Sequence, residues 1–329
     1  MKVLITGSEG FIGSHLTELL VKSGYKVTAL TLYNSFNNIG WLKNIDKKIF
    51  KKIKILSGDI RDKSLVDEIV KNKDVVINLA ALIGIPYSYK SVESYVDTNV
   101  KGTMNLLNSS KKFKVKKFIQ TSTSEVYAGT LLAGKLKFPT PENSQIILPD
   151  LSLPRTSYML SKIYGEAMCL SSGLPVTVVR PHNIYGPRMG LAHVIPELLK
   201  QAWFADSGSS LYVASVEHSR TFCFIADAVS YLTALLDRPG TGSIYNLGRQ
   251  EPEILIGDLA QLIIEIVGKR LTIEALPATH GSPARRAPDM RSLIQLTGIQ
   301  PVCDLESGIQ HTLDWYRENI FVHGEGVSQ

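Results

Sequence analysis

The chain has 329 residues, 44% hydrophobic and 20% charged, a balance that excludes a disordered or fibrous protein. The net charge of +6 sits largely in two lysine-rich stretches, residues 43–54 and 111–117, which we interpret as solvated surface and not as a nucleic-acid-binding module. No uncharged apolar run approaches the roughly 18 residues of a membrane span, so neither nucleic acid nor membrane is expected as a partner.

The elements alternate regularly from the start of the chain. A buried strand at residues 3–5 is followed by a glycine-rich turn, a helix with Ile12, Leu16 and Leu20 on one face, and a second strand at 27–30. We predict further strands at 53–56, 75–78, 118–120 and 176–179, and helices around 62–71, 92–112 and 157–172. This βα alternation predicts an α/β fold of Rossmann type, a doubly wound parallel sheet.

The texture changes after residue 181, where proline and glycine are more frequent and the βα alternation stops. We therefore expect a cofactor domain over residues 1–180, which also carries the catalytic residues. A smaller α/β substrate-binding domain is expected over 181–320, with some of its elements returning to the main sheet, and a loose tail over 321–329.

Cysteine and histidine usage argues against a metal site. The three cysteines, Cys169, Cys223 and Cys303, are odd in number and far apart, and the seven histidines form no HxxxH or HExxH pair. We expect no metal, no disulfide framework and a cytoplasmic location.

The segment Thr6–Gly13, TGSEGFIG, predicts a dinucleotide site because it joins the first strand to the first helix. Gly7 permits the tight turn, Gly10 lets backbone N–H groups approach a pyrophosphate, and Gly13 lets the helix pack closely on the strand. An ordinary structural turn is the alternative for such a triplet elsewhere in a chain.

Two positions bear on which dinucleotide binds. Asp59, in GDIRD after the third strand, is placed to accept from an adenine amino group, although a helix N-cap explains it equally well. The second strand ends at Thr31, without the acid that often binds the ribose of NAD and without an arginine for the 2′-phosphate of NADP. We expect NAD, with NADP not excluded.

The catalytic constellation lies in two segments, TSTSEVY at 121–127 and YMLSK at 158–162. The i to i+4 spacing puts Tyr158 and Lys162 on one helical face, where the ammonium favours a phenolate beside the cofactor. A tyrosine with a lowered pKa is a usable base, and Thr123 can share the hydrogen bond to a substrate hydroxyl. A YxxxK alone would be an ordinary amphipathic helix, but the glycine turn and the Ser/Thr-rich strand end argue otherwise.

Together these segments resemble the NAD-dependent epimerase/dehydratase family of nucleotide sugars, within the extended short-chain dehydrogenases. TGSEGFIGSHL, GDIRD, NLAAL, DTNVKGT, TSTSEVY, YMLSK, RPHNIYGPR and RTFCFIADAV occur in the family's order over residues 1–315. Within the family, residues 33–42 and 81–103 resemble sugar-nucleotide 4,6-dehydratases of the legionaminic-acid type.

The resemblance implies roles for individual residues. Thr123, Glu125, Tyr158 and Lys162 are the implied catalytic residues. Phe11, Ile12, Ile60, Ala80, Ala81 and Asn99 join the three glycines, Asp59, Tyr158 and Lys162 in binding the cofactor. The implied substrate-binding residues are Ser88, Asn183, Arg188, Arg220, Arg285 and Arg286, with arginines suited to the diphosphate because each offers bidentate donors.

Two departures from the family pattern affect the expected reaction. The loop over residues 128–155 is longer than the usual linker, and Ser124 replaces the acidic residue of the glucose 4,6-dehydratases. Ser followed by Glu125 resembles mannose-nucleotide dehydratases and glucuronate decarboxylases. We favour a 4,6-dehydratase in which Tyr158 initiates oxidation at C4 and Glu125 removes the C5 proton.

Other functions stay open at this point. The same C4 intermediate serves an NDP-sugar 4-epimerase or a UDP-glucuronate-type decarboxylase. A non-catalytic NAD(P)-sensing Rossmann protein is opposed by Tyr158 with Lys162, and a small-carbonyl reductase by the arginines. The helices over 92–107 and 158–170 carry more apolar residues than one sheet face covers, which predicts a homodimer.

Overall fold

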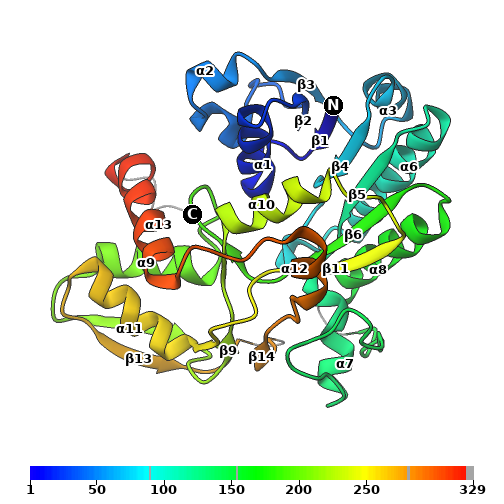
Figure 1. Cartoon of the computed structure of the whole chain (residues 1–329). Coiled ribbons are helices and arrows are strands. Elements are labelled where there is room, and N and C mark those ends of the chain that lie inside the picture. The colour runs from blue at the N-terminus through cyan, green and yellow to red at the C-terminus, as the bar shows by residue number, and fades with distance from the viewer. Residues whose placement is uncertain (89, 153–154, 280–281, 324–329) are drawn as a thin grey trace.

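The computed structural model describes residues 1–88, 90–152, 155–279 and 282–323. A seven-stranded, all-parallel sheet in the order β11-β6-β5-β4-β1-β2-β3 forms its centre (Figure 1). Its strands are β1 (Lys2–Thr6), β2 (Lys26–Leu32), β3 (Lys54–Gly58), β4 (Val75–Asn78), β5 (Lys117–Thr121), β6 (Val176–Pro181) and β11 (Ser243–Leu247). The order reverses between β1 and β4, which confirms the predicted doubly wound fold and places a ligand crevice at the ends of these strands.

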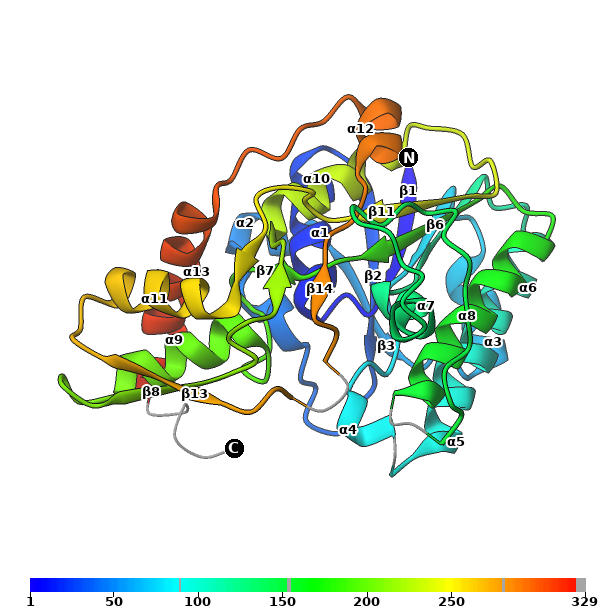
Figure 2. The same ribbon diagram turned by 90° about the horizontal axis from the view of Figure 1, so that it is seen from below.

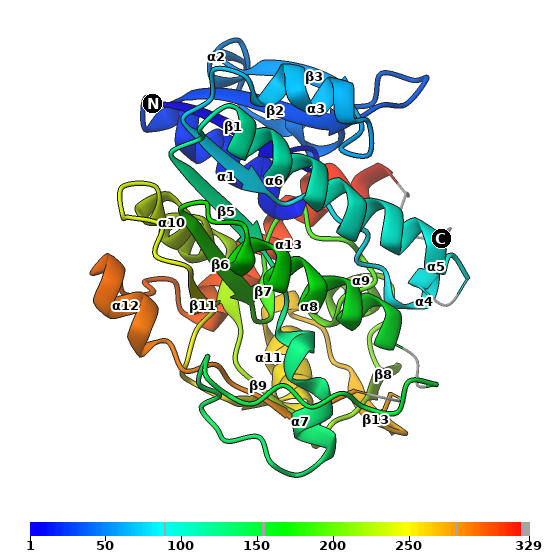
Figure 3. The same ribbon diagram turned by 90° about the vertical axis from the view of Figure 1, so that its right-hand side faces the viewer.

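Helices cover both faces of this sheet, as the continuous apolar strands require. Alternate strand residues such as Val3 and Ile5 pack with α1 (Phe11–Lys22) and α10 (Ile225–Leu235). Leu4 and Phe118, on the opposite face, pack with α3 (Lys63–Val70), α6 (Thr103–Lys112) and α8 (Thr156–Ser171), which Figure 3 shows along one side of the molecule. The expected helix over 92–112 consists of α5 (Val92–Tyr95), the π-helical η2 (Val96–Gly102) and α6.

The second half of the chain builds a smaller layer beside the sheet. Its helices are α9 (Val194–Phe204), α11 (Ile256–Val267), α12 (Arg291–Thr297) and α13 (Leu305–Asn319). Its short strands are β7 (Ile184–Tyr185), β8 (Ser210–Ala214), β9 (Ser219–Arg220), β10 (Cys223–Phe224), β12 (Ile254–Leu255), β13 (Thr272–Leu276) and β14 (Arg285–Arg286). The same half supplies β11 to the main sheet and α10 to its face, so one core joins the two halves.

Short helical turns complete the chain. These are η1 (Gly40–Asn44), α2 (Lys47–Phe50), α4 (Ile85–Ser88), η3 (Ser124–Tyr127), α7 (Ala128–Leu132) and η4 (Phe321–His323). Residues 324–329 of the expected tail lie outside the described residues. Within the described residues no helix is long and apolar enough to cross a bilayer.

The long segment between the two catalytic motifs folds back on the second half of the chain. After α7 it reaches the backbone just beyond β14, where Thr140 forms a bridge with Pro288, and the view in Figure 2 draws α7 between the labels of β14 and α8. Thr140 pairs through its backbone with Ala287 and Asp289, at N–O distances of 2.8 and 2.9 Å. The segment therefore forms one wall of the pocket that β14 also lines.

Candidate active site

The glycine turn leaves room for a phosphate at the start of α1. Gly7 has φ +67°, and a Cβ added there would lie 2.8 Å from the backbone nitrogen of Ala80. A Cβ on Gly13 would lie 2.1 Å from the carbonyl oxygen of Gly7, so helix and strand pack as closely as predicted. Gly10 is the N-cap without a side-chain cap, and its Cβ would meet nothing closer than 3.4 Å. Phe11 and Ile12 begin the helix, so their N–H groups lie at this open end.

Glu9, in the glycine turn, places a carboxylate at the end of β2, although the sequence did not predict a role for it. The Glu9 carboxylate accepts the backbone N–H of Leu32 at 2.9 Å, and its second oxygen is buried without a partner among the described residues. This arrangement supplies beside Thr31 the carboxylate that the strand itself lacks, in a position that suits a ribose hydroxyl. The charged residue inside the glycine turn was the available signal.

The other expected cofactor residues line the ends of β3 and β4. Asp59 is tied to the Arg61 guanidinium at 2.6 and 2.9 Å, and Ile60 is buried against Gly102. Ala80, followed by Ala81, donates its N–H to Thr6 at 3.2 Å.

Asn99, in the π-helical turn, holds the next stretch of backbone in place. It bonds both the N–H and the carbonyl of Leu82, at 2.9 and 3.0 Å, and donates to Ser161 of α8 at 3.0 Å. Asn99 therefore acts here as a positioning residue that links the β4 crevice to the catalytic helix.

The catalytic pair lies where β5 ends beside α8. The buried Tyr158 hydroxyl is hydrogen-bonded to Thr123. The buried Lys162 ammonium donates to the Thr121 carbonyl at 3.0 Å. Burial lowers the pKa of Lys162 to about 8.

The electrostatics of Tyr158 differ from expectation. Burial raises the pKa of Tyr158 to about 12, with the Thr123 hydrogen bond opposing the rise and Glu125 adding to it. The expected lowering by Lys162 is absent because the ammonium faces the Thr121 carbonyl. A cation beside the phenol would act in the opposite direction and lower the pKa of Tyr158.

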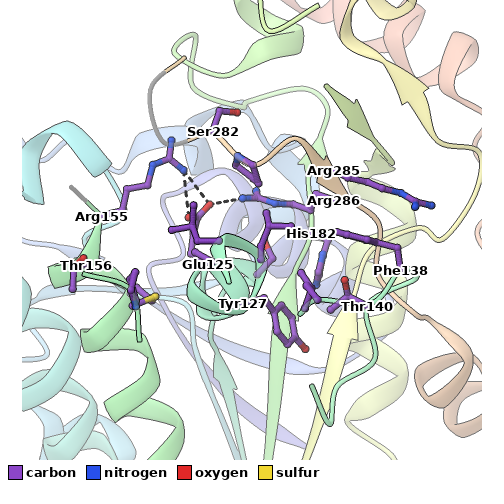
Figure 4. Close-up of a pocket in the computed structure, with 18 residues that line it drawn as sticks. Glu125, Tyr127, Phe138, Thr140, Arg155, Thr156, His182, Ser282, Arg285 and Arg286 are labelled. Carbon is purple, nitrogen blue, oxygen red and sulfur yellow. Dashed lines mark hydrogen bonds and ion pairs between the residues drawn. The ribbon is translucent and has the colours of Figure 1, made fainter. Parts of the chain in front are cut away.

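Glu125 lies between two arginines, and the three side chains line one pocket (Figure 4). Its carboxylate accepts from Arg286 of β14 at 2.5 Å and from Arg155 at the start of α8 at 3.3 Å. Although burial disfavours the charge, the two guanidiniums hold the pKa of Glu125 below its usual range. Arg155 was not among the predicted residues; it is the N-cap residue of α8, with a left-handed backbone at φ +75°, and no helical spacing indicated it.

The predicted substrate residues separate into two groups. Asn183 accepts a hydrogen bond from Arg286 at 3.4 Å. Burial, and then the like charge of the nearby Arg286, lower the pKa of Arg220 to about 10. Arg285 instead stacks on Phe138 and pairs with Glu253 at 2.5 Å.

Arg188 and Ser88 take other positions. Arg188 pairs with Glu18 of α1 at 2.8 Å and so faces the cofactor helix, away from the Glu125 cluster. Ser88 is buried at the end of α4. Of the four predicted arginines, Arg220 and Arg286 therefore join the charged site.

Comparison with known proteins places these motifs in one family. Residues 3–248 match the model of the NAD dependent epimerase/dehydratase family. The chain is 34% identical to the UDP-N-acetyl-alpha-D-glucosaminuronate decarboxylase of Bacillus cytotoxicus, covering 96% of this chain and 98% of that one. It is 30% identical to a dTDP-glucose 4,6-dehydratase of Streptomyces antibioticus, covering 97% and 93%.

A solved structure agrees with these matches. A variant of the UDP-glucuronic acid 4-epimerase of Bacillus cereus, in complex with NAD and a fluorinated UDP-glucuronic acid, superposes with a TM-score of 0.82 at 26% identity, covering 97% of this chain and 99% of that one. The glycine turn, the Thr123–Tyr158–Lys162 set and these matches show that the chain belongs to the NAD-dependent epimerase/dehydratase family of nucleotide-sugar enzymes.

Proposed function

We propose that this enzyme decarboxylates a nucleoside-diphosphate uronate through transient oxidation at C4, with NAD as its cofactor. The observation that carries the proposal is the Arg155–Glu125–Arg286 cluster, with Ser124 beside it. Two guanidiniums against one carboxylate leave a net positive charge at the reaction centre. A sugar with a carboxylate at C6 matches that charge, whereas a neutral hexose does not.

The same cluster is poorly suited to dehydration. Loss of the C6 hydroxyl needs an acid for the leaving oxygen and a base for the C5 proton, each with a pKa near the working pH. Ser124 is no carboxylic acid, and the arginines hold the pKa of Glu125 below its usual range. Decarboxylation needs neither group, because a ketone at C4 already allows the C6 carboxylate to leave as carbon dioxide.

The steps assign work to the residues of the chain. Tyr158 takes the proton of the C4 hydroxyl, and Thr123 shares the hydrogen bond to that oxygen. When bound, NAD supplies a hydride acceptor for C4, returns the hydride there, and carries a positively charged ring. In the 4-ketose the C5–C6 bond breaks, its electron pair becomes the C4–C5 enolate, and C5 takes a proton from solvent. Tyr158 finally returns its proton to the C4 oxygen.

The binding residues follow from their places around this centre. We propose that the glycine turn holds the pyrophosphate of NAD and that Glu9, not a residue at the end of β2, accepts from the adenosine ribose. Arg220, Asn183 and Arg286 form the side on which the sugar nucleotide's diphosphate binds. Ser88 is assigned to the sugar from the resemblance alone.

Dehydration is the second candidate, favoured by the resemblance of residues 33–42 and 81–103 to 4,6-dehydratases. The test is to incubate the NAD-loaded enzyme with UDP-glucuronate, UDP-N-acetylglucosaminuronate, UDP-glucose and UDP-N-acetylglucosamine and to read product masses. Loss of carbon dioxide from a uronate supports the proposal. Loss of water from a hexose establishes the dehydratase, and a new isomer of unchanged mass establishes the epimerase.

The fate of the C5 hydrogen sharpens this test. With a substrate deuterated at C5, decarboxylation keeps the label and adds one solvent hydrogen, because only the C5–C6 bond breaks. Dehydration removes the label. In Glu125→Gln a dehydratase should slow by about 10²- to 10⁴-fold, the usual worth of a positioned base. A decarboxylase should slow less, since Glu125 there only holds the two arginines.

We also propose a homodimer formed by α5, η2, α6 and α8. Apolar side chains on this face are partly or largely exposed: Val92, Val96, Met104, Leu160, Tyr164 and Leu170, at 48%, 43%, 44%, 36%, 57% and 44%. The elements contact one another, so these side chains belong to one side of the molecule (Figure 3). Sedimentation should show a dimer at micromolar concentration, and monomer alone would contradict the proposal.

A further inference from the structure

The catalytic helix α8 carries a buried carboxylate that the proposed mechanism does not use. Glu166 lies four residues after Lys162, so the two side chains lie on one face of the helix, where they are 4% and 5% exposed. A charge buried in this way is costly unless it is paired. The partners of Glu166 therefore indicate what its carboxylate does.

Arg180 of β6 is the ionic partner of Glu166. Its guanidinium donates to the two carboxylate oxygens at 2.9 and 2.6 Å, and both side chains are buried. The same guanidinium donates to the Tyr127 hydroxyl at 2.7 Å and lies 4.8 Å from the centre of the Tyr127 ring. One buried ion pair thus joins α8 and β6 to η3, the turn that carries Glu125.

The carboxylate of Glu166 also holds the end of β5. The Ser122 hydroxyl donates to Glu166, and the Ser122 N–H donates to the carbonyl of Val179 at 2.7 Å. The next residue is Thr123, whose side chain is hydrogen-bonded to Tyr158. Glu166 therefore fixes the stretch of backbone that presents Thr123.

Glu166 acts in addition on the charge of Lys162. Burial lowers the pKa of Lys162 to about 8, although Glu166 and, after it, Cys169 act in the opposite direction. Burial raises the pKa of Cys169 to about 12, so this side chain is a neutral thiol near neutral pH. Within the described residues, Glu166 is therefore the charged group that keeps the pKa of Lys162 from falling further.

The elements packed against α8 add no second charge of this kind. Their charged and titratable side chains do not contribute to the pKa of Lys162 within the described part of the chain. They face other partners or solvent: Tyr95 of α5 the Tyr158 ring, Asp97 and Lys101 of η2 each other, Lys112 of α6 Asp67, Lys117 of β5 the carbonyls of Leu235 and Arg238, Glu125 of η3 two arginines, Tyr127 of η3 Arg180, and Tyr87, Glu93 and Lys111 solvent.

We propose that Glu166 is a positioning residue for the Thr123–Tyr158–Lys162 set: it fixes the strand end that presents Thr123 and supplies the negative charge beside Lys162 on α8. Only a charged Lys162 favours the phenolate of Tyr158, because a neutral amine exerts no such field. Arg180 acts by holding the carboxylate in place. The inference rests on the roles proposed for Tyr158 and Lys162 and is independent of which sugar nucleotide reacts.

The experiment compares two variants of Glu166 in the NAD-loaded enzyme. Glu166→Gln keeps the length of the side chain and removes its charge, whereas Glu166→Asp keeps the charge and shortens the side chain. The ionisation of Lys162 is followed by NMR of lysine labelled at Cε, and its signal is identified by its loss in Lys162→Met. In Glu166→Gln we expect Lys162 to titrate at a pH lower by about one pH unit, the effect of one nearby opposite charge. In Glu166→Asp it should titrate close to the wild-type pH.

The rate of nicotinamide reduction in a single turnover with UDP-glucuronate gives a second readout. Glu166→Gln should be close to wild type near pH 6 and about 10-fold slower near pH 9, because a pKa lower by about one pH unit leaves ten times less ammonium there. Glu166→Asp should be slower by about 10-fold at every pH, since Thr123 is displaced while the charge remains. A purely structural role would slow both variants by a factor that does not depend on pH.

Two further variants serve as controls. Asp227→Asn removes another buried carboxylate, on α10, which accepts from the backbone N–H groups of Val302 and Cys303 at 3.0 and 3.2 Å. It should leave the titration of Lys162 in place. Glu166→Gln leaves Arg180 buried without its ionic partner, which is costly to stability. If that variant does not fold, Glu166→Gln combined with Arg180→Met removes both charges and should show the same change in Lys162.

The NMR titration separates this inference from the proposed function. A lower pKa of Lys162 in the variant without the Glu166 charge supports the inference even if no uronate loses carbon dioxide, an outcome that overturns only the proposed function. An unchanged titration of Lys162, or an equal shift in Asp227→Asn, overturns the inference while decarboxylation stands.

Discussion

The two sides of the crevice are built in different ways. On the cofactor side, Gly7, Gly10 and Gly13 shape the site with backbone alone, inside one strand–turn–helix unit of the chain. On the sugar side, Glu125, Arg155 and Arg286 come from segments as far as 161 residues apart and meet only through side chains. A local sequence pattern specifies the first site, whereas tertiary packing assembles the second.

The difference lies in what each ligand demands. A pyrophosphate needs N–H groups and the absence of a Cβ, which a short motif delivers. Distinguishing one sugar from another needs charges and volumes placed within ångströms, which several elements must share. Substitutions on the two sides should therefore fail in different ways.

The largest effect is expected at Tyr158, where the two sides meet. Tyr158→Phe removes the proton acceptor for the C4 hydroxyl, so kcat should fall by about 10²- to 10⁴-fold while the affinity for the sugar nucleotide stays near wild type. Single-turnover absorbance of the nicotinamide would show no reduction. Reduced cofactor formed at the wild-type rate would remove Tyr158 from the chemistry.

Arg286 and Arg285 are adjacent in β14 and offer a matched pair. Arg286→Lys breaks the contacts to Glu125 and Asn183 and should raise KM for the sugar nucleotide by about 10- to 100-fold, because a lysine cannot replace a bidentate guanidinium. Arg285→Lys changes an exposed ion pair and should leave KM within about 3-fold. A larger rise in KM for Arg285→Lys than for Arg286→Lys would show that Arg285, and not Arg286, contacts the sugar nucleotide.

Gly10 and Gly13 separate ligand space from packing on the cofactor side. Gly13→Ala forces a Cβ against the Gly7 carbonyl and should cost about 1–3 kcal/mol of unfolding free energy. Gly10→Ala has room for its Cβ in the free protein and should keep stability but weaken NAD binding. Thermal denaturation and fluorescence titration check the two effects, and equal stability losses would contradict the distinction.

The smallest effect concerns acid. The pKa of His182 is about 3 in the folded chain, below its ordinary value of 6.5, so between these values the unfolded chain binds a proton that the folded chain does not. The neutral, buried His182 therefore does not reduce the unfolding free energy above pH 6.5. Below that pH the unfolding free energy falls, by about 2 kcal/mol at pH 5, because the unfolded chain gains a proton.

His182→Gln should therefore lose less stability than wild type between pH 7 and 5 in urea denaturation. The lowered pKa of His15, about 4, acts with the same sign in both proteins and cancels in the comparison. Identical pH dependence in the two proteins would show that His182 is protonated or exposed in the fold.

The sequence predicted the sheet, the glycine turn and the common helical face of Tyr158 and Lys162, because these depend on periodicity and on spacing within one element. It did not place Glu9, Arg155 or His182, whose partners lie 23, 30 and 64 residues away. Nor did it predict the raised pKa of Tyr158, since the position of Lys162 relative to Thr121 depends on how β5 packs against α8. The spacing of a motif predicts which residues lie on one face of a helix, whereas the pKa values of those residues depend on how deeply tertiary packing buries them.

The segment from α7 to Arg155 begins shortly after Thr123, at the end of β5, and leads directly into α8, the helix that carries Tyr158. Because its two ends adjoin the strand end and the helix that carry the catalytic groups, a change in its length would alter the wall of the pocket beside Glu125 while both points of attachment stay in place. Transplanting this segment into a relative should carry the substrate preference with it, provided that the backbone at residues 287–289, with which it pairs, is transplanted too.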